Sequence, residues 1–309
     1  DFYSLKNKKK ICDLNISAFN SSNDKYTTLQ RFTLIDFLRN KLPSNLINYN
    51  KKVIEVQNNS VVTKIVFEDN SFIECDYLII SDGIFSKTRS LITNKESKPK
   101  YFNSIALRGN IDQNDIQYID HNNITLLLGS NLHSVVYPVN QHGQFNFVTI
   151  LRKKLNSKEL ADYSLFNSKE FISSTLLEIS KQVDNNIIEN LKNVKCFPIF
   201  VSSDIFLPKS KNIFSIGDAF FAFPPTFAQG ASQSIEVAHE LYQNLETKND
   251  QFNKERIIRT NMIDRKSRLN YFAFHLSSPL MQFFRNLIIR YLAKNKRFIN
   301  SYLGKIYKD

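Results

Sequence analysis

The sequence has few of the residues that would mark a secreted, disulfide-bonded or zinc-binding protein. It contains no tryptophan, seven glycines and three cysteines in 309 residues. Cys12, Cys75 and Cys196 lie far apart and are odd in number, which fits neither a disulfide framework nor the spacing of a metal site. Free cysteines are typical of a reducing compartment, so we expect a cytoplasmic protein.

Long hydrophobic runs are also missing. No apolar stretch approaches about 18 residues, so we expect no membrane-spanning helix. The first ten residues, DFYSLKNKKK, contain no apolar segment of the kind found in signal peptides, and they include no methionine. We therefore expect no secretion signal, and we interpret the missing methionine as the mark of a fragment.

Hydrophobic and basic residues are abundant. Hydrophobic residues make up 42% of the chain, which is enough for one large domain or two medium-sized ones. The net charge is +12, and the basic residues are spread out except for Lys8–Lys10 and the C-terminal tail. No nucleic-acid motif accompanies them, so we expect no nucleic-acid partner.

One stretch, residues 212–241, combines a strand, a turn, a loop and a helix. The apolar run 213–216 is typical of a short buried strand, and Gly217-Asp218 ends it. A carboxylate at this position can accept hydrogen bonds from sugar or ribityl hydroxyls, and the following helix N-terminus favours an anionic ligand. The helix begins at Gly230, and its spacing places on one face Ala231, Ile235, Ala238, Tyr242 and Leu245.

This stretch resembles the second FAD-binding motif of the flavoprotein aromatic hydroxylases, the family of p-hydroxybenzoate hydroxylase and of ubiquinone-biosynthesis monooxygenases. The family pattern is roughly GDAAHxxPPxxGQGxNxxxEDA. The matching residues are Gly217, Asp218, Ala219, Pro224, Pro225, Gln229, Gly230, Glu236 and Ala238. The departures are Phe220 for Ala, Phe221 for His, Ala228 for Gly, Ser232 for Asn and Val237 for Asp.

The resemblance implies roles for these residues. Asp218, after Gly217, would hold the ribityl chain of FAD. The helix start would face the pyrimidine edge of the flavin, through the backbone of Gln229, Gly230, Ala231 and Ser232. Pro224 and Pro225 would border the substrate, although an ordinary rigid turn is the alternative. No residue is identified as the catalytic acid or base.

Two further motifs of the family occur upstream in the same order. Arg31 and Leu34 fit the R-x-x-L segment, whose arginine contacts the FAD pyrophosphate in the family. After a predicted buried strand, residues 81–89 fit D-G-x-x-S-x-x-R, which in the family lies beside the FAD ribose and pyrophosphate and also serves NAD(P)H. Its fixed residues here are Asp82, Gly83, Ser86 and Arg89. The alternatives are a solvated arginine and an ordinary turn before a polar helix start.

The resemblance implies an α/β fold with an α+β insertion, namely a p-hydroxybenzoate-hydroxylase-like FAD domain. The domain is N-terminally incomplete, because no two glycines lie two positions apart and the G-x-G-x-x-G fingerprint is therefore absent. We predict four parts: the first part of the FAD domain (1–98), an antiparallel-sheet substrate domain (99–205), the second part of the FAD domain (206–250) and C-terminal helices (251–309).

Periodicity and turn residues predict the elements within these parts. Strands are expected at 11–18, 53–56, 61–67, 72–80, 102–111, 124–128, 134–139, 145–151 and 194–200, helices at 27–42 (with Thr33 as N-cap) and 169–183, and turns at 21–25, 68–71, 129–131 and 140–143. The resemblance would make one face of the inserted sheet a wall of the substrate pocket, with Arg108, Tyr137, Phe147 and Phe200 as candidates and ordinary core or surface positions as the alternative. His121, His133 and His142 have no metal-site spacing, so we expect no metal.

The C-terminal region has two predicted helical stretches separated by Pro279. Residues 252–269 form a long basic helix. Beyond the proline, apolar residues recur at 280, 284, 287, 288, 291 and 292, with basic residues between them. One interpretation is a helix packed on its own domain, and the other is peripheral contact with an anionic membrane.

Three functions follow. The first is an FAD-dependent, NAD(P)H-using monooxygenase that hydroxylates a small aromatic or quinone-precursor substrate through a C4a-hydroperoxyflavin. The second is a flavin-dependent reductase or cyclase of the same fold, and the third is a degenerate scaffold without activity. A flavin halogenase is disfavoured, because its tryptophan signature cannot occur in a chain without tryptophan. The oligomeric state has no sequence signal.

Overall fold

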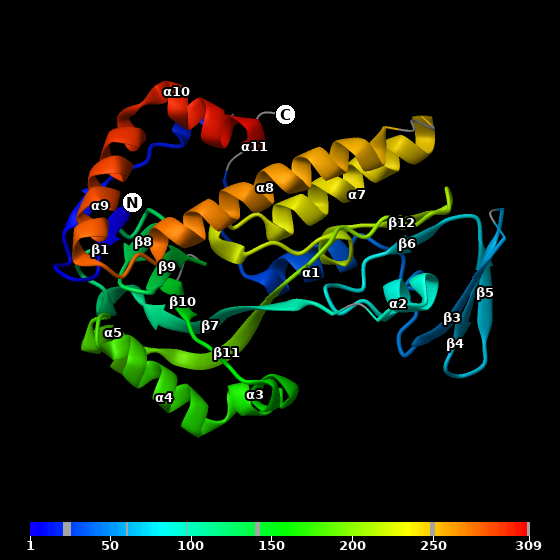
Figure 1. Ribbon diagram of the computed structural model, residues 1–309, viewed down its shortest axis with the longest axis horizontal. Coiled ribbons are helices and arrows are strands. Elements are labelled where there is room, and N and C mark those ends of the chain that lie inside the picture. Colours follow the sequence, from blue (N-terminus) through cyan, green and yellow to red (C-terminus); the bar gives the residue numbers. More distant parts are fainter. Residues whose placement is uncertain (21–25, 60, 97, 140–142, 248–250, 308–309) are drawn as a thin grey trace. The chain divides into compact units, whose positions relative to one another are not determined.

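The computed structural model describes residues 1–20, 26–59, 61–96, 98–139, 143–247 and 251–307. The predicted turn at 21–25, His142 with most of the turn at 140–143, and residues 248–250 lie outside the described residues. Packing divides the chain into two units (Figure 1). Unit 1 comprises 1–42, 103–198 and 272–309, and unit 2 comprises 43–102 and 199–271.

Unit 1 contains most of a seven-stranded sheet with the order β11-β7-β10-β9-β8-β1-β2; residues 100–102 of β7 and 199–201 of β11 belong to unit 2. The strands are β1 (Phe2–Ser4), β2 (Lys10–Cys12), β7 (Lys100–Asp112), β8 (Thr125–Leu128), β9 (Leu132–Pro138), β10 (Gln144–Arg152) and β11 (Lys192–Val201). β10 is antiparallel to β7 and β9, and β9 is antiparallel to β8, which confirms the predicted antiparallel insertion. β1 joins the sheet parallel to β8. The strand predicted at 11–18 is wrong beyond Cys12, because η1 (Ser17–Phe19) turns the chain.

Unit 1 also contains several helices. They are α1 (Arg31–Arg39), α3 (Ser157–Ala161), α4 (Lys169–Ser180), α5 (Asn185–Asn190), α9 (Pro279–Lys294), α10 (Lys296–Ile299) and α11 (Lys305–Tyr307), with short turns η2 (Gln113–Asp115), η3 (Leu165–Asn167) and η5 (Asn300–Gly304). The main core joins strand residues such as Phe145 and Phe147 to Ile179 of α4. Thr33 does not cap α1: the helix begins two residues earlier, after Gln30, whose side chain makes no capping hydrogen bond.

Unit 2 contains two small sheets. β3 (Val53–Asn58), β4 (Thr63–Phe67) and β5 (Phe72–Cys75) form an antiparallel sheet, and β6 (Leu78–Ile80) pairs with β12 (Ile213–Ser215) in parallel. The helical elements are α2 (Lys87–Thr93), α6 (Gly217–Phe220), η4 (Pro225–Phe227), α7 (Gly230–Thr247) and α8 (Phe252–Phe274), whose last three residues belong to unit 1. The predicted strand 72–80 is therefore two strands with different partners.

The parallel pairing of β6 was expected, but its complete burial was not found. Ile80 is buried, whereas Tyr77 and Ile79 are about half exposed. β12 is the one neighbour of β6 within the described residues, so the other edge of β6 has no strand beside it there. Ile79 and Ile80 point to opposite faces of the strand, and the face that carries Ile79 is only partly covered. An apolar run predicts a buried strand only where both of its faces are covered.

The helix predicted from Gly230 is found, but the apolar face that its spacing defines is mostly exposed. Gln233, Val237 and Leu241 are the buried residues of this helix, whereas Ile235 and Tyr242 are more than half exposed. Val237 and Leu241 pack on Phe252, with Phe214, Ile216 and Leu245 beside them. The helix spacing is correct, but packing covers a different side of it. Of the described helices, none combines the length and apolar character needed to cross a bilayer.

Candidate functional site

Two turns follow the carboxyl ends of neighbouring strands in unit 2. In the β6–β12 pair, Ile80 lies opposite Ser215, and the Ile216 N–H donates to the Ile80 carbonyl oxygen at 2.9 Å. The chain then continues into Asp82-Gly83 after β6 and into Gly217-Asp218 after β12. Because the strands are parallel, both turns lie at the carboxyl end of the β6–β12 pair, and the carboxyl ends of strands are where open α/β sheets bind their ligands.

Glycine is required at both turns for conformational reasons. Gly83 has a φ of 84° and Gly217 a φ of 57°, values that side-chain-bearing residues rarely adopt. A Cβ on Gly217 would also lie 3.2 Å from Ser234 Oγ on the second turn of α7. This close approach places the start of α7 directly beside the end of β12.

The N-terminus of α7 is open to a ligand. α7 has 18 residues, and its first N–H groups have no acceptor within the helix. Gly230, Ala231 and Ser232 are exposed, and a Cβ on Gly230 would meet no atom within 4 Å. Aligned N–H groups with the positive end of the helix dipole favour an anion or an electron-rich edge. A small pocket between the β12 turn and this helix is lined by Gly217, Asp218, Phe220, Phe221, Phe223, Gly230, Gln233, Ser234, Val237, Arg256 and Thr260.

Residues 82–89 shape the start of α2. The Thr88 N–H donates to Asp82 Oδ2 at 3.2 Å, and the Arg89 N–H donates to Ser86 Oγ at 3.0 Å. The Arg89 guanidinium forms an ion pair with Asp204 and lies 5.1 Å from the centre of the Phe206 ring. The turn-and-helix-start interpretation therefore describes the local contacts, and Arg89 has a partner that the sequence did not indicate.

The loop that follows α6 is tied to its surroundings by backbone contacts. Phe221, which stands where the family has histidine, is buried, and its N–H donates to the Gly217 carbonyl at 3.1 Å. The Ala222 N–H donates to Ser202 Oγ at 2.9 Å. Pro224 is buried and Pro225 exposed. Ala228, which replaces a family glycine, has a φ of 52° and is therefore strained.

A buried ion network joins α7 to α8, and two of its residues, Gln233 and Arg256, line the pocket. Arg256, which is 4% exposed, donates to Glu236 at 2.9 Å, to Glu240 at 3.0 Å and to Gln233 Oε1 at 3.2 Å. Arg259 holds Glu236 with two hydrogen bonds, at 2.9 and 2.8 Å. Burial acts to raise the pKa of Glu236, but the two arginines outweigh it and leave this pKa below its usual value. The matching family Glu and the basic pattern of 252–269 were the available sequence signals for this network.

Other predicted site residues belong to unit 1. Arg31 is exposed at the start of α1. Tyr137 on β9 is half-buried, and its hydroxyl accepts a hydrogen bond from Asn146 Nδ2 at 2.7 Å. Arg108 lies 5.7 Å from the centre of the Phe197 ring. Phe147 is completely buried in the core, which is the alternative to the pocket wall that its position allowed.

The remaining candidates have ordinary structural contacts. Phe200, in unit 2, contacts the rings of Phe85 and Tyr101 at 5.1 and 5.8 Å. His121 lies 2.8 Å from the Ile116 carbonyl oxygen, and His133 is buried in unit 1. Among the described residues, histidine, cysteine and carboxylate side chains form no group of three that could hold a metal ion.

A family model described as an FAD binding domain matches residues 52–268. The chain belongs to this FAD-binding family. The match covers all of the motif residues in unit 2, from Asp82 to Ser232.

Two curated proteins are similar in sequence. Salicylate hydroxylase from Pseudomonas putida is 22% identical over 239 residues, which are 70% of this chain and 53% of that protein. The 6-hydroxynicotinate 3-monooxygenase of Bordetella bronchiseptica is 24% identical over 218 residues, 69% of this chain and 55% of that protein. The chain thus spans about half the length of these curated relatives.

Solved structures show the fold. HpxO from Klebsiella pneumoniae, complexed with FAD and uric acid, has a TM-score of 0.73 at 18% identity and covers 89% of this chain and 71% of its own. A salicylate hydroxylase substrate complex has a TM-score of 0.71 at 16% identity, with 90% and 72% covered. The p-nitrophenol 4-monooxygenase of Pseudomonas putida has a TM-score of 0.73 at 13% identity, with 99% and 79% covered. The predicted p-hydroxybenzoate-hydroxylase-like fold is confirmed.

The residues of unit 2 fit the cofactor of this FAD-binding family. The backbone at Gly217 adopts a left-handed conformation that favours glycine, a Cβ there would lie 3.2 Å from Ser234 Oγ, and the space beside Gly230 is open. An exposed carboxylate, Asp218, and the free N–H groups of a helix start lie next to this space. Carboxylates accept hydrogen bonds from hydroxyls, and helix N–H groups donate to carbonyl or anionic oxygens, which are the groups that FAD presents.

Proposed function

We propose that this chain forms part of an FAD-dependent, NAD(P)H-using monooxygenase that hydroxylates a small aromatic or quinone-precursor ring. The observation that carries this proposal is the parallel pairing of β6 with β12. This pairing brings Asp82-Gly83 and Gly217-Asp218 to the carboxyl end of the two strands, beside the open N-terminus of α7. Hydroxylases and monooxygenases among the relatives support the reaction class.

Each element would have a separate role toward FAD. Asp218 would accept hydrogen bonds from the ribityl hydroxyls. The backbone N–H groups of 230–232 would donate to the pyrimidine oxygens of the flavin and favour negative charge there. Gly83 and Gly217 would let the backbone approach the cofactor closely. When bound, the flavin supplies hydride acceptance from NAD(P)H and oxygen activation, and the protein supplies position and exclusion of water.

Substrate orientation is proposed for the prolines of the loop and for Tyr137. The Tyr137 hydroxyl accepts from Asn146 Nδ2, which fixes the phenol and leaves its own O–H free to donate to a substrate oxygen. Pro224 and Pro225 give their loop a rigid backbone, because the ring of each proline fixes φ.

The cofactor part of the proposal is tested by titrating the protein into FAD and following flavin fluorescence. Asp218→Ala should weaken FAD binding by roughly tenfold to a hundredfold, because a charged acceptor of hydrogen bonds is lost. Asp76→Ala is the matched control, since Asp76 is exposed in the same unit and lies between β5 and β6. Equal affinity of wild type and Asp218→Ala would contradict the assigned role of Asp218.

The reaction is tested by supplying aromatic substrates with NADPH or NADH and identifying the product by mass spectrometry. We expect substrate-stimulated consumption of the nicotinamide and a product that carries one added oxygen atom. A saturated or cyclised product without added oxygen would favour the reductase or cyclase. Absence of bound flavin both from this chain and from a folded form with any upstream coding sequence restored would overturn the enzyme proposal and favour the scaffold.

A further inference from the structure

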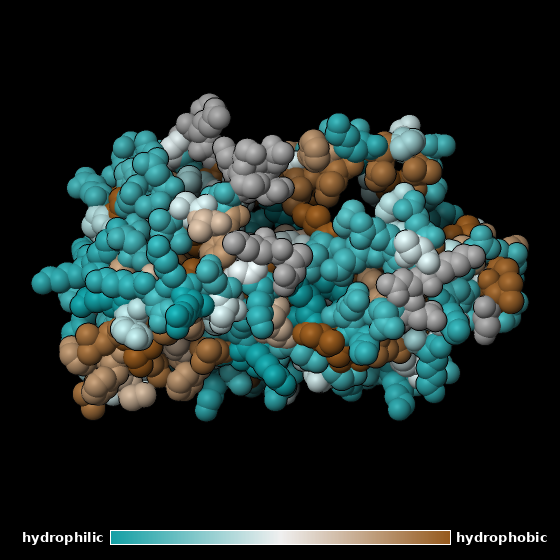
Figure 2. Space-filling model, turned by 90° about the horizontal axis from the view of Figure 1, so that it is seen from above, coloured by the Kyte–Doolittle hydropathy of each residue, from teal (hydrophilic) through white to brown (hydrophobic). Residues whose placement is uncertain are grey.

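The helix α9 in unit 1 turns its large apolar side chains away from the core. These residues recur at spacings of three and four, so they form one continuous stripe along the helix. The apolar stripe consists of Leu280, Phe283, Phe284, Leu287, Ile288 and Tyr291, and each is between 42% and 70% exposed. Hydrophobic side chains also gather at the left of Figure 2, where α9 is drawn in Figure 1.

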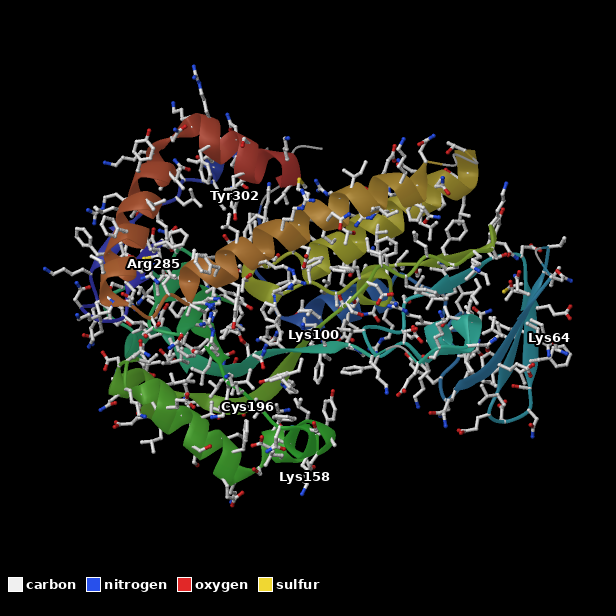
Figure 3. All side chains as sticks on the ribbon, viewed as in Figure 1. Lys64, Lys100, Lys158, Cys196, Arg285 and Tyr302 are labelled. Carbon is white, nitrogen blue, oxygen red and sulfur yellow. The ribbon has the colours of Figure 1, made fainter. Side chains whose placement is uncertain are left out.

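The opposite face of α9 attaches the helix through polar groups. Arg285 is 4% exposed, and its Nη1 donates to the carbonyl oxygens of Ala273 and Phe274 at 3.4 and 3.5 Å, at the end of α8 (Figure 3). Burial lowers the pKa of Arg285 to about 10. Gln282 Nε2 donates to the Leu276 carbonyl at 2.9 Å.

A small apolar contact completes this attachment. Ile289 packs on the cluster of Ile11, Leu128 and Phe274. Arg290 Nε donates to the Ile11 carbonyl oxygen at 3.0 Å. The helix is therefore held by its inner face, and the apolar stripe is not needed to keep it in place.

Positive charge surrounds the end of the apolar stripe. Lys294 lies one helical turn beyond Tyr291 on the same face, and Lys296 and Arg297 follow in α10. All three are exposed, and no carboxylate of the described residues pairs with them. The sequence from 265 to 307 contains no aspartate or glutamate at all.

The positive charges of Lys294, Lys296 and Arg297 indicate which kind of partner covers the apolar stripe. A second copy of this chain would present the same acid-free helix, so no carboxylate would face the three cations. An anionic bilayer offers both an apolar layer for the stripe and phosphates for the cations. We propose that α9 docks the protein on the surface of an anionic phospholipid membrane, with the helix lying in the interface plane. This surface is independent of the proposed reaction, because docking requires neither flavin nor substrate.

The test is flotation of the protein with vesicles of phosphatidylcholine alone and of phosphatidylcholine mixed with phosphatidylglycerol. We expect binding to the anionic vesicles, weakened by added salt, and little binding to the neutral ones. Phe284→Glu combined with Ile288→Glu should lower the partition coefficient at least roughly tenfold, because two apolar side chains no longer enter the bilayer. Leu177→Glu is the matched control: Leu177 is 69% exposed on α4 of the same unit, and this variant should bind like wild type.

A second variant changes the charge and leaves the apolar stripe intact. Lys294→Gln combined with Lys296→Gln should weaken binding to anionic vesicles by roughly thirtyfold, since each lysine near such a surface contributes about fivefold. Circular dichroism of each variant checks that it is folded.

Results of two kinds would overturn the proposal. The first is absence of binding by the folded wild type, or equal binding by wild type and both double variants. The second is a wild-type dimer that Phe284→Glu/Ile288→Glu converts to a monomer without any lipid binding, which would make the apolar stripe a self-association surface.

Discussion

The two units bury polar side chains in different ways. In unit 2, the buried Arg256 is matched by Glu236, Glu240 and Gln233, so charge meets charge across α7 and α8. In unit 1, the buried His133 and His275 lie 4.9 Å apart between ring centres and belong to an apolar neighbourhood. A buried charge such as that of Arg256 is stabilised by ionised partners, whereas His133, whose Nδ1 has no hydrogen-bond partner in the described part of the chain, is favoured in its neutral form.

The environment of His133 favours its neutral form. His133 Nδ1 is buried and has no hydrogen-bond partner in the described part of the chain, and the Phe274 ring lies 5.2 Å away. His275 Nε2 lies 3.1 Å from the Ile150 carbonyl oxygen. Burial, and then the nearby His275, hold the pKa of His133 well below its usual value. The two units should therefore respond to acid in different pH ranges.

Removing a charge from the network of unit 2 should have the largest effect. Glu236→Gln leaves the buried Arg256 with a weaker partner and should lower the free energy of unfolding by about 2–3 kcal/mol. The measurement is urea unfolding at neutral pH, with hydrogen exchange of α7 to assign the loss to unit 2. Glu255→Gln, on an exposed position of α8, is the control and should change stability by less than about 0.5 kcal/mol. Equal losses in the two variants would show that the network adds no stability.

Mild acid should weaken unit 1 before unit 2. The unfolded chain binds a proton at His133 near pH 6.5, and the folded chain binds it only at a lower pH, so stability falls as pH drops below 6.5. The expected loss is up to about 1.4 kcal/mol per pH unit. Glu236 stabilises the folded chain as an ionised group, because its pKa is lower in the folded chain than in the unfolded chain. This stability is present above about pH 4.5, the usual pKa of a glutamate, and is lost as the pH falls through the folded pKa.

This difference is measured by hydrogen exchange of β9 and α7 from about pH 7 to about pH 5.5. Protection of β9 should fall over this range while protection of α7 is retained. His133→Phe should flatten the response of β9, whereas His239→Gln, on the exposed side of α7, should leave it unchanged. A parallel decline of both elements in the wild type would contradict the separation of the two units.

The smallest effect is expected at the strained turn before α7. Ala228→Gly removes the left-handed strain of a side-chain-bearing residue and should raise stability by about 0.5–1 kcal/mol. Ala238→Gly, at an exposed position inside α7, should lower stability by about 1 kcal/mol because glycine weakens helix interiors. Both are measured by urea unfolding. If Ala228→Gly is also destabilising, the turn is not strained.

Much of the framework could be predicted from local sequence. Alternation and turn residues located β7 to β11, because in an antiparallel sheet each strand is set by its own period and by the turn beside it. The motif residues located the two glycine turns, because glycine adopts positive φ values at the lowest steric cost. The motif residues Gly217, Asp218 and Gly230 therefore indicated the correct family from the sequence alone.

The sequence by itself determined the family, the strand pattern of the insertion and the positions of the turns, because each depends on residues close together in the chain. The tertiary structure decided which helix faces are covered. Periodicity placed Ile235 and Tyr242 on one side of α7 and the apolar stripe on one side of α9, yet both sides are exposed. Burial depends on what packs against a face, and partners such as Asp204 for Arg89 come from distant segments that no local pattern identifies.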